Sequence, residues 1–277
     1  MDRIPKGGLI GRAMAFYEKL RDMQIPRHAA NAGYFIVLSI FPTLVVLLGF
    51  LRYTDLDAGD LLDLLSGFLP EVLLPAAEKM IISTYANTSA AVVSVSALGA
   101  VWAASRGIYG LLMGLNAIYE AQEDRGYWYT RLISVLYMFL FLLVLLLTLV
   151  LNVFGGTLLR TLPPARHGLG LFLADVVDFR LILMLLLQVG VFTAMYMVLP
   201  NRKNSFSESL PGAILASMGW MVFSKLFSFY VENFPSYANV FGSVYAFALG
   251  MLWLYICLSI VFYGGAANYL LMQKKDK

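Results

Sequence analysis

Long apolar segments without charged residues divide this chain of 277 residues. The clearest segment runs from Leu132 to Phe154, contains no charged residue, and is nearly all Leu, Val and Phe between Leu140 and Leu151. A helix rises about 1.5 Å per residue, so about 20 such residues cross the roughly 30 Å hydrocarbon core of a bilayer. This segment therefore predicts a transmembrane helix.

Six segments of this kind predict an all-α, polytopic membrane protein with six transmembrane helices and short interfacial helices. The expected spans are residues 31–51, 90–116, 132–154, 181–199, 209–230 and 240–271. They form a transmembrane domain over 31–272, which follows an amphipathic amino-terminal arm (1–30) and precedes a basic tail (273–277). The composition agrees, because 13% of residues are charged, whereas soluble domains carry about 25%.

The distribution of Lys and Arg predicts the orientation of the spans. Thirteen basic residues lie in the arm, in the connections between spans 2 and 3 and spans 4 and 5, and in the tail, whereas five lie on the opposite side. The positive-inside rule then places both termini in the cytoplasm. Ile10, Met14, Tyr17 and Leu20 recur at helical spacing, which favours an arm helix on the inner membrane surface over a solvated tail. No cleavable signal peptide is predicted, since the first apolar segment follows a long charged arm.

Small residues predict which helices pack inside. Lipid is as apolar as Leu, so membrane helices associate through close packing and polar contacts. Small residues recur in spans 2, 5 and 6, at Gly99, Ala103, Gly107, Gly212, Gly242 and Gly250. Span 3 is bulky throughout and span 4 has few small residues. Spans 1, 2, 5 and 6 are therefore expected to form the inner bundle, with spans 3 and 4 nearer lipid.

Two basic side chains lie within expected spans, where a charge is costly and usually faces a cavity, a partner or the interface. Arg106 is an expected anchor for an anionic headgroup, because a guanidinium binds phosphate in a bidentate manner. The alternative is snorkelling or capping of a neighbouring helix. Lys225, near the outer end of span 5, is an expected second station for an anion, and outward snorkelling is the simpler alternative.

Pro42, near the middle of span 1, is an expected hinge. Proline removes one backbone hydrogen bond and kinks a helix, and Ser39 can help to satisfy the freed groups. Broken helices line cavities in transporters, although static bundles also contain them. Further substrate-binding candidates are polar residues near the ends of the inner helices: Asn31, Tyr34, Asn116, Tyr230 and Asn268.

Signals for enzyme chemistry are absent from the sequence. It has no phosphate-binding glycine loop, no metal motif and no G-x-S-x-G motif. His28 and His167 lie far apart and beside no cysteine cluster, and Cys257 is the single cysteine. We therefore expect no catalytic residue, no metal and no cofactor.

Several motifs resemble those of a known family. Residues 29–35 (AANAGYF) with 38–42 (LSIFP), and residues 102–107 (WAASRG) with 115–119 (LNAIY), are similar to the first- and second-span signatures of the YihY / virulence factor BrkB family. Shorter matches extend the resemblance to about residue 272, among them 199–202 (LPNR), 241–243 (FGS) and 253–255 (WLY).

The resemblance implies a six-helix bacterial inner-membrane protein. Relatives have been called ribonuclease BN, but this sequence lacks the clustered His and Asp ligands of a metal-dependent nuclease, so we expect neither nuclease activity nor a nucleic-acid partner. The last span of many relatives reads like Gly-Ala-Glu-x-Asn, whereas Ala266 stands here at the Glu position. Any role of that Glu would be missing or relocated.

These features predict a transporter or flippase for an amphiphilic, anionic envelope lipid or lipid-linked precursor, with membrane lipids as its partners. A rival hypothesis is a scaffold that docks envelope-assembly proteins through the basic arm and the amphipathic connection at 56–86. A third is an intramembrane lipid-modifying enzyme. The oligomeric state stays open, and a homo-oligomer is compatible with the sequence.

Overall fold

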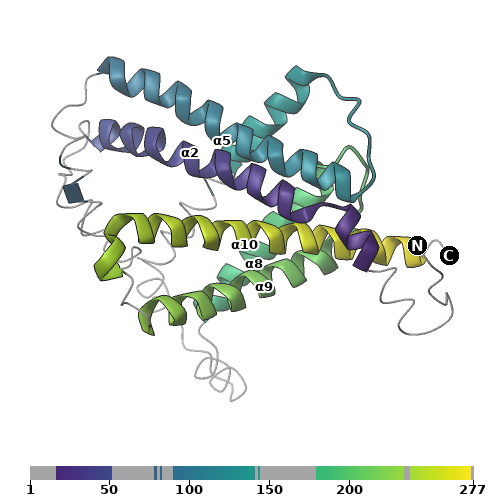
Figure 1. Ribbon diagram of the computed structural model, residues 1–277. Coiled ribbons are helices and arrows are strands. Elements are labelled where there is room, and N and C mark those ends of the chain that lie inside the picture. Colours follow the sequence, from purple (N-terminus) through teal and green to yellow (C-terminus); the bar gives the residue numbers. More distant parts are fainter. Residues whose placement is uncertain are drawn as a thin grey trace, which may run out of the picture. The chain divides into compact units, whose positions relative to one another are not determined.

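The computed structural model describes residues 17–51, 78–79, 82, 90–140, 143, 179–233 and 238–275. Every regular element in these ranges is a helix, and none of them contains a strand. The labelled helices are α2 (Ile25–Leu51), α5 (Ala90–Ile118), α8 (Phe179–Val198), α9 (Phe206–Asn233) and α10 (Ala238–Lys275) (Figure 1). Residues 17–22 and 127–140 are also helical.

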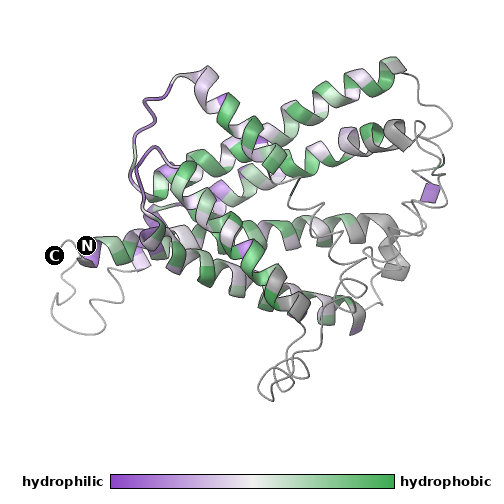
Figure 2. Ribbon diagram, turned by 180° about the vertical axis from the view of Figure 1, so that it is seen from behind, coloured by the Kyte–Doolittle hydropathy of each residue, from purple (hydrophilic) through white to green (hydrophobic). Residues whose placement is uncertain are grey.

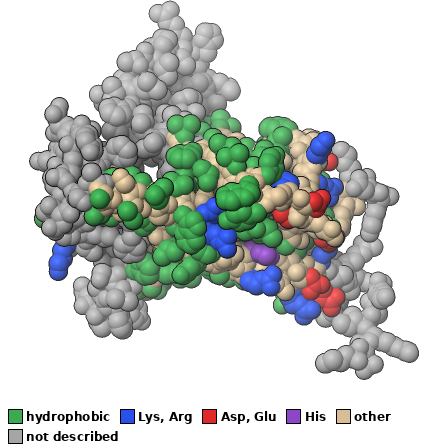
Figure 3. All heavy atoms as spheres, turned by 90° about the horizontal axis from the view of Figure 1, so that it is seen from above, with side chains coloured by type: hydrophobic (Ala, Val, Ile, Leu, Met, Phe, Trp, Pro, Cys, Tyr) green, Lys and Arg blue, Asp and Glu red, His purple; other side chains and the backbone are tan. Residues whose placement is uncertain are grey.

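Among the residues that the structure describes, three helices are long and apolar enough to cross a membrane: Ala91–Ile118, Phe206–Val231 and Phe247–Lys274. Met184–Val198 is a shorter apolar helix. Figure 2 shows hydrophobic residues along these helices, and Figure 3 shows hydrophobic side chains over much of the visible described surface. Large apolar side chains such as Leu98 and Leu226 are exposed, as expected for helices that lipid surrounds. The chain is an all-α polytopic membrane protein.

The helix ends differ from the expected span ends, because local capping extends the helices. The Glu208 carboxylate accepts the Ser205 backbone N–H at 2.7 Å, which is one half of a capping box, and α9 begins at Phe206 instead of residue 209. The α5 helix continues to Ile118 and ends where Glu120 adopts a left-handed conformation with φ of 52°. The α2 helix begins at Ile25, inside the expected arm.

Several sequence expectations lie outside the described residues. They include the arm before residue 17, nearly all of the amphipathic connection at 56–86, and the third span after residue 140 apart from Leu143.

The chain divides into two compact units. Unit 1 comprises residues 1–25, 112–221 and 260–277, and unit 2 comprises residues 26–111 and 222–259. The α5, α9 and α10 helices each contribute residues to both units.

In unit 1, α9 and α10 approach each other closely at two glycines. A Cβ atom at Gly264 would lie 2.6 Å from the Gly212 carbonyl oxygen and 2.5 Å from the Tyr196 hydroxyl, so neither α9 nor Tyr196 leaves room for a larger residue. The fully buried Tyr196 of α8 donates its hydroxyl proton to the Val261 carbonyl oxygen at 2.6 Å. Glycine thus creates the space that the tyrosine ring fills.

This packing corrects one sequence expectation, namely that span 4 lies nearer lipid. The carboxy-terminal part of α8 is buried in unit 1, including Phe192, Thr193 and Met195. The expectation relied on small residues within span 4 itself, whereas the close approach uses Gly264 and Gly212 of its neighbours. The other end of α8 does expose Ile182 and Leu186.

In unit 2, small residues of α5 pack against α2. A Cβ atom at Gly107 would lie 2.6 Å from Ile36 Cγ1, and one at Gly110 would lie 3.1 Å from the Ala32 Cα. Gly99 has a looser contact, 3.9 Å from the Pro42 Cβ.

Three further small residues were expected to pack between helices, and their surroundings differ. Ala103 is buried, whereas a Cβ at the exposed Gly250 would meet no atom within 4 Å in the part of the chain that the structure describes, so the structure does not show the packing role expected there. Gly242 lies in α10, but its surroundings fall outside the described residues.

Candidate functional site

The most distinctive side chain in unit 2 is Arg106, which is half-buried on α5. Its guanidinium carbon lies 5.6 Å from the centre of the Phe35 ring and 5.4 Å from the centre of the Tyr109 ring. Within the described ranges, ion pairs form at Arg21 and Arg125, and no carboxylate lies within 4.0 Å of the Arg106 guanidinium. Two aromatic faces therefore hold a charge that no described carboxylate neutralises.

Arg106 also lies well inside its helix. It precedes Ile118 by about three turns, or about 18 Å along the axis of α5. Basic side chains snorkel most readily from near helix ends. The position therefore favours a role other than simple snorkelling.

An aromatic group surrounds Arg106 that sequence reasoning did not identify. Phe35 of α2 has edge-to-face contacts with Tyr34, at 5.2 Å between ring centroids, and with Trp102 of α5, at 6.2 Å. Trp102 and Tyr109 flank Arg106 at spacings of four and three residues, which place them on the same side of a helix. The spacing of Trp102 and Tyr109 could have been recognised in the sequence. The contact of Phe35 from α2 depends on tertiary packing.

The other predicted binding residues of unit 2 are exposed. Lys225 is exposed on α9, next to the exposed apolar side chains of Val222, Leu226 and Phe229. Asn31, Tyr34 and Tyr230 are also exposed. Of these candidates, Tyr34 is linked to the Arg106 group through Phe35.

Around Pro42, hydroxyl side chains bond to the backbone of α2. Ser39 donates to the Ile36 carbonyl oxygen and Thr43 donates to the Ser39 carbonyl oxygen, both at 2.6 Å. The helix continues through Pro42. Such side-chain bonds can bend a helix without making it movable. Movement at Pro42 therefore stays a prediction.

Unit 1 contains a polar network that joins two connections between helices. Arg125 binds Glu123 in a bidentate manner, with both nitrogen–oxygen distances at 2.7 Å, and also donates to the Leu199 carbonyl oxygen at 2.8 Å. The predicted site residue Asn116 donates to Glu123 at 2.5 Å and accepts the Asn201 backbone N–H at 2.7 Å. We call these five residues the loop network.

The charges of the loop network are mostly buried, with side-chain exposures of 16% for Arg125 and 13% for Glu123. Burial alone would raise the pKa of Glu123, but hydrogen bonds from Arg125 and Asn116 more than offset this effect, so its pKa lies below the ordinary value. Hydrogen bonding to Glu123 raises the pKa of Arg125. The pair is therefore ionised at neutral pH.

Asn268, another predicted binding residue, connects two helices. It is fully buried, accepts the Gly212 backbone N–H at 2.6 Å, and donates to the Ser209 carbonyl oxygen at 2.9 Å. Its neighbour Tyr119 is also buried, and burial raises the pKa of Tyr119 to about 12. The geometry favours a structural role for Asn268, because its amide already binds the backbone of α9.

The amino-terminal segment reaches the end of α10 in unit 1. Lys19 lies over the Tyr269 ring, with its nitrogen 4.9 Å from the ring centre, and donates to Gln273. Tyr269 also packs edge to face against Tyr119 at 6.1 Å between ring centroids. No group of three or more His, Cys, Asp or Glu residues that could hold a metal ion occurs among the described residues.

The apolar helices, together with the group around Arg106 and the loop network, define an integral membrane protein. More particularly, the chain belongs to the Virulence factor BrkB family, whose model matches residues 16–277. It is 31% identical over 247 residues to a putative ribonuclease-like protein, YfkH, of Bacillus subtilis, covering 89% of this chain and 90% of that protein. It is 28% identical to a UPF0761 membrane protein of Photobacterium profundum, covering 90% of this chain and 76% of the relative. No solved structure matches the chain.

Proposed function

We propose that this protein moves an anionic, amphiphilic envelope lipid or lipid-linked precursor across the bacterial inner membrane. The observation that carries the proposal is Arg106, a half-buried charge about three turns inside a membrane-spanning helix. A charge in such a position is costly unless it has a function or a partner. A lipid phosphate is a partner that arrives within the membrane itself.

The chemistry of the group around Arg106 fits a phosphate headgroup. A guanidinium presents several N–H donors in one plane and binds phosphate in a bidentate manner. The Phe35 and Tyr109 rings contact the charge through their π faces, and no carboxylate of the described residues pairs with it. Acyl chains of the ligand would remain in the bilayer.

In the proposed mechanism, both termini are cytoplasmic and Arg106 receives the headgroup from the inner leaflet. Pro42 lies against Gly99, at 3.9 Å from the position of an added Cβ, so a change in α2 at this proline would alter its contact with α5. Lys225, exposed on α9, would offer a second cationic station. No bond in the lipid is made or broken.

The test is lipid movement between leaflets of liposomes that contain the purified protein. Lipids labelled on the headgroup, anionic or zwitterionic, are followed with wild-type protein and with Arg106→Gln and Arg106→Lys. We expect movement of the anionic lipid to be lost with Gln and partly retained with Lys, since the charge persists. The matched control is Arg202→Gln, which removes an exposed arginine from the α8–α9 connection.

Undiminished movement in a folded Arg106→Gln protein would refute the assigned role. If wild-type protein moves no lipid, the scaffold hypothesis gains support, and tolerance of Arg106 substitutions in cells would strengthen it. An unchanged lipid mass after incubation separates transport from an intramembrane lipid-modifying activity.

A further inference from the structure

Two buried hydroxyl groups of unit 1 have no hydrogen-bond partner among the residues that the structure describes. They belong to Tyr119, which follows α5 and is 2% exposed, and to Ser209 in the first turn of α9, which is 1% exposed. Buried hydroxyls nearly always bind another protein group or an ordered water molecule, because burying them without a partner is costly. The two hydroxyls therefore indicate a bound ligand.

Asn268 of α10 brings the two residues together. Its amide donates to the Ser209 carbonyl oxygen at 2.9 Å, and the same amide lies beside the Tyr119 hydroxyl, although not in hydrogen-bonding geometry. The Asn268 carbonyl oxygen accepts the Gly212 backbone N–H at 2.6 Å. One side chain of α10 thus holds the end of α5 and the start of α9 in the same small region.

The packing in this region is tight. A Cβ atom at Gly212 would lie 2.6 Å from the Asn268 Cγ atom. A Cβ atom at Gly265 would lie 3.0 Å from a Leu115 methyl carbon and 3.9 Å from the Tyr119 ring. A ligand with several non-hydrogen atoms would therefore have to displace these neighbours, whereas a single water molecule needs little space.

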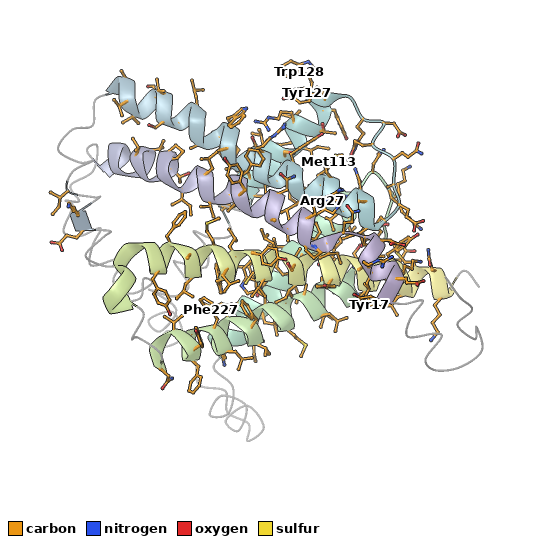
Figure 4. All side chains as sticks on the ribbon, in the orientation of Figure 1. Tyr17, Arg27, Met113, Tyr127, Trp128 and Phe227 are labelled. Atoms are coloured by element: carbon orange, nitrogen blue, oxygen red, sulfur yellow. The ribbon has the colours of Figure 1, made fainter. Side chains whose placement is uncertain are left out.

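The amino-terminal segment covers Tyr269, which is a neighbour of Tyr119. Figure 4 marks this segment at Tyr17, beside the carboxy-terminal end of α10. Lys19 from the segment lies over the Tyr269 ring and donates to Gln273. Tyr269 in turn packs edge to face against Tyr119, at 6.1 Å between ring centroids. A ligand of the Tyr119 hydroxyl is therefore held inside the protein.

The chemistry of the two hydroxyls favours water over an ion. Each hydroxyl can donate one hydrogen bond and accept others, and a water molecule can do the same in return. A metal cation would leave both hydroxyl protons without an acceptor. An anion would be repelled by Glu208, whose carboxylate already accepts the Ser205 backbone N–H at the start of α9, next to Ser209.

We propose that one ordered water molecule bridges the Tyr119 and Ser209 hydroxyls beside Asn268 and so joins the end of α5 to the start of α9. The site lies within unit 1. It is independent of the proposed lipid movement, which depends on Arg106 in unit 2.

The test uses the sign of the change in unfolding temperature in detergent. Removing a buried hydroxyl that binds nothing would stabilise the protein. We expect the opposite, a decrease of about 3 °C, for Tyr119→Phe and for Ser209→Ala, because each substitution removes one partner of the water. The double variant should lose less than the sum of the two, since both hydroxyls bind the same molecule.

The matched control is Ser207→Ala, which removes an exposed hydroxyl from the same turn of α9 and should shift the unfolding temperature by less than about 1 °C. A higher unfolding temperature for either buried substitution, or strictly additive losses, would overturn the proposal. Stabilisation of the wild type by chloride over gluconate that Ser209→Ala abolishes would overturn it in favour of a bound anion.

A second measurement needs no variant. In a density map of the wild-type protein that resolves ordered water, we expect a peak about 2.8 Å from both hydroxyl oxygens. A map that resolves other buried waters but has no density between Tyr119 and Ser209 would contradict the bridge.

Discussion

Arg125 in unit 1 and Arg106 in unit 2 have opposite kinds of neighbours. In unit 1, Asn268 and Tyr196 bind the backbone of neighbouring helices, and the Glu123–Arg125 pair joins two connections. In unit 2, Arg106 has aromatic neighbours and no carboxylate partner among the described residues. Polar groups whose hydrogen bonds are satisfied in a low-dielectric setting hold the segments that they join in fixed positions. A cationic side chain without a fixed carboxylate partner is suited to bind an anionic ligand reversibly.

The largest expected effect follows from the glycine contacts. Gly264→Ala in unit 1 should destabilise the protein by about 3 kcal/mol, because the new methyl group meets a backbone oxygen and a buried tyrosine hydroxyl. Gly107→Ala in unit 2 should cost less, about 1 kcal/mol, since it meets mainly the Ile36 side chain and its nearest backbone atom lies 3.3 Å away. Thermal unfolding in detergent measures both.

The matched control for these substitutions is Gly190→Ala on α8. Its Cβ would meet no atom of the described residues within 4 Å, so replacing a helical glycine should stabilise the protein by about 0.5 kcal/mol. Equal losses at Gly264 and Gly107 would remove the contrast between the two units.

The next effect concerns Asn268. Asn268→Ala should destabilise the protein by about 2 kcal/mol, because it leaves the buried Gly212 N–H without its side-chain acceptor. Asn233→Ala is the control, since that exposed amide donates to the Phe229 carbonyl oxygen of its own helix. Loss of lipid movement with unchanged unfolding temperature would instead assign Asn268 to substrate binding.

The loop network predicts a pH dependence of stability. The pKa of Glu123 is lower in the folded protein than in the unfolded chain, so its ionisation stabilises the fold above the unfolded value of about 4.5. This contribution should be lost as the pH falls from there through the lower folded pKa. As the pH is lowered from about 7 to about 3, the unfolding temperature should fall less steeply for Glu123→Gln than for the wild type. An identical pH profile in both proteins would contradict this role.

The smallest expected change in stability is at Arg106. Arg106→Gln should alter the free energy of unfolding by less than about 1 kcal/mol, because no described carboxylate loses its partner. Lipid movement should nevertheless be lost. A large destabilisation would show instead that the aromatic contacts of Arg106 hold α2 and α5 together, as the loop network does in unit 1.

Much of the fold follows from the sequence, because a bilayer imposes a simple requirement on length and polarity. The apolar segments predicted α5, α9 and α10 to within a few residues at most ends. The helix ends were less predictable, since they depend on local groups such as the capping pair of Ser205 and Glu208. Arg106 stood out in the sequence as a charge in a span, and its role stays a prediction. Its contact with the Phe35 ring could not be predicted, because it joins two separate helices.

The sequence by itself determined the class of this protein, its helical content and the unusual position of Arg106, because uncharged segments of membrane length and a charge within one can be recognised from residue order alone. Only the tertiary structure decided what the polar candidates do. Asn116, Asn268 and Asn31 have the same side-chain chemistry. Asn116 and Asn268 are buried and accept hydrogen bonds from the backbone, whereas Asn31 is exposed. The difference arises from the neighbours that other helices bring, which spacing along one helix does not encode.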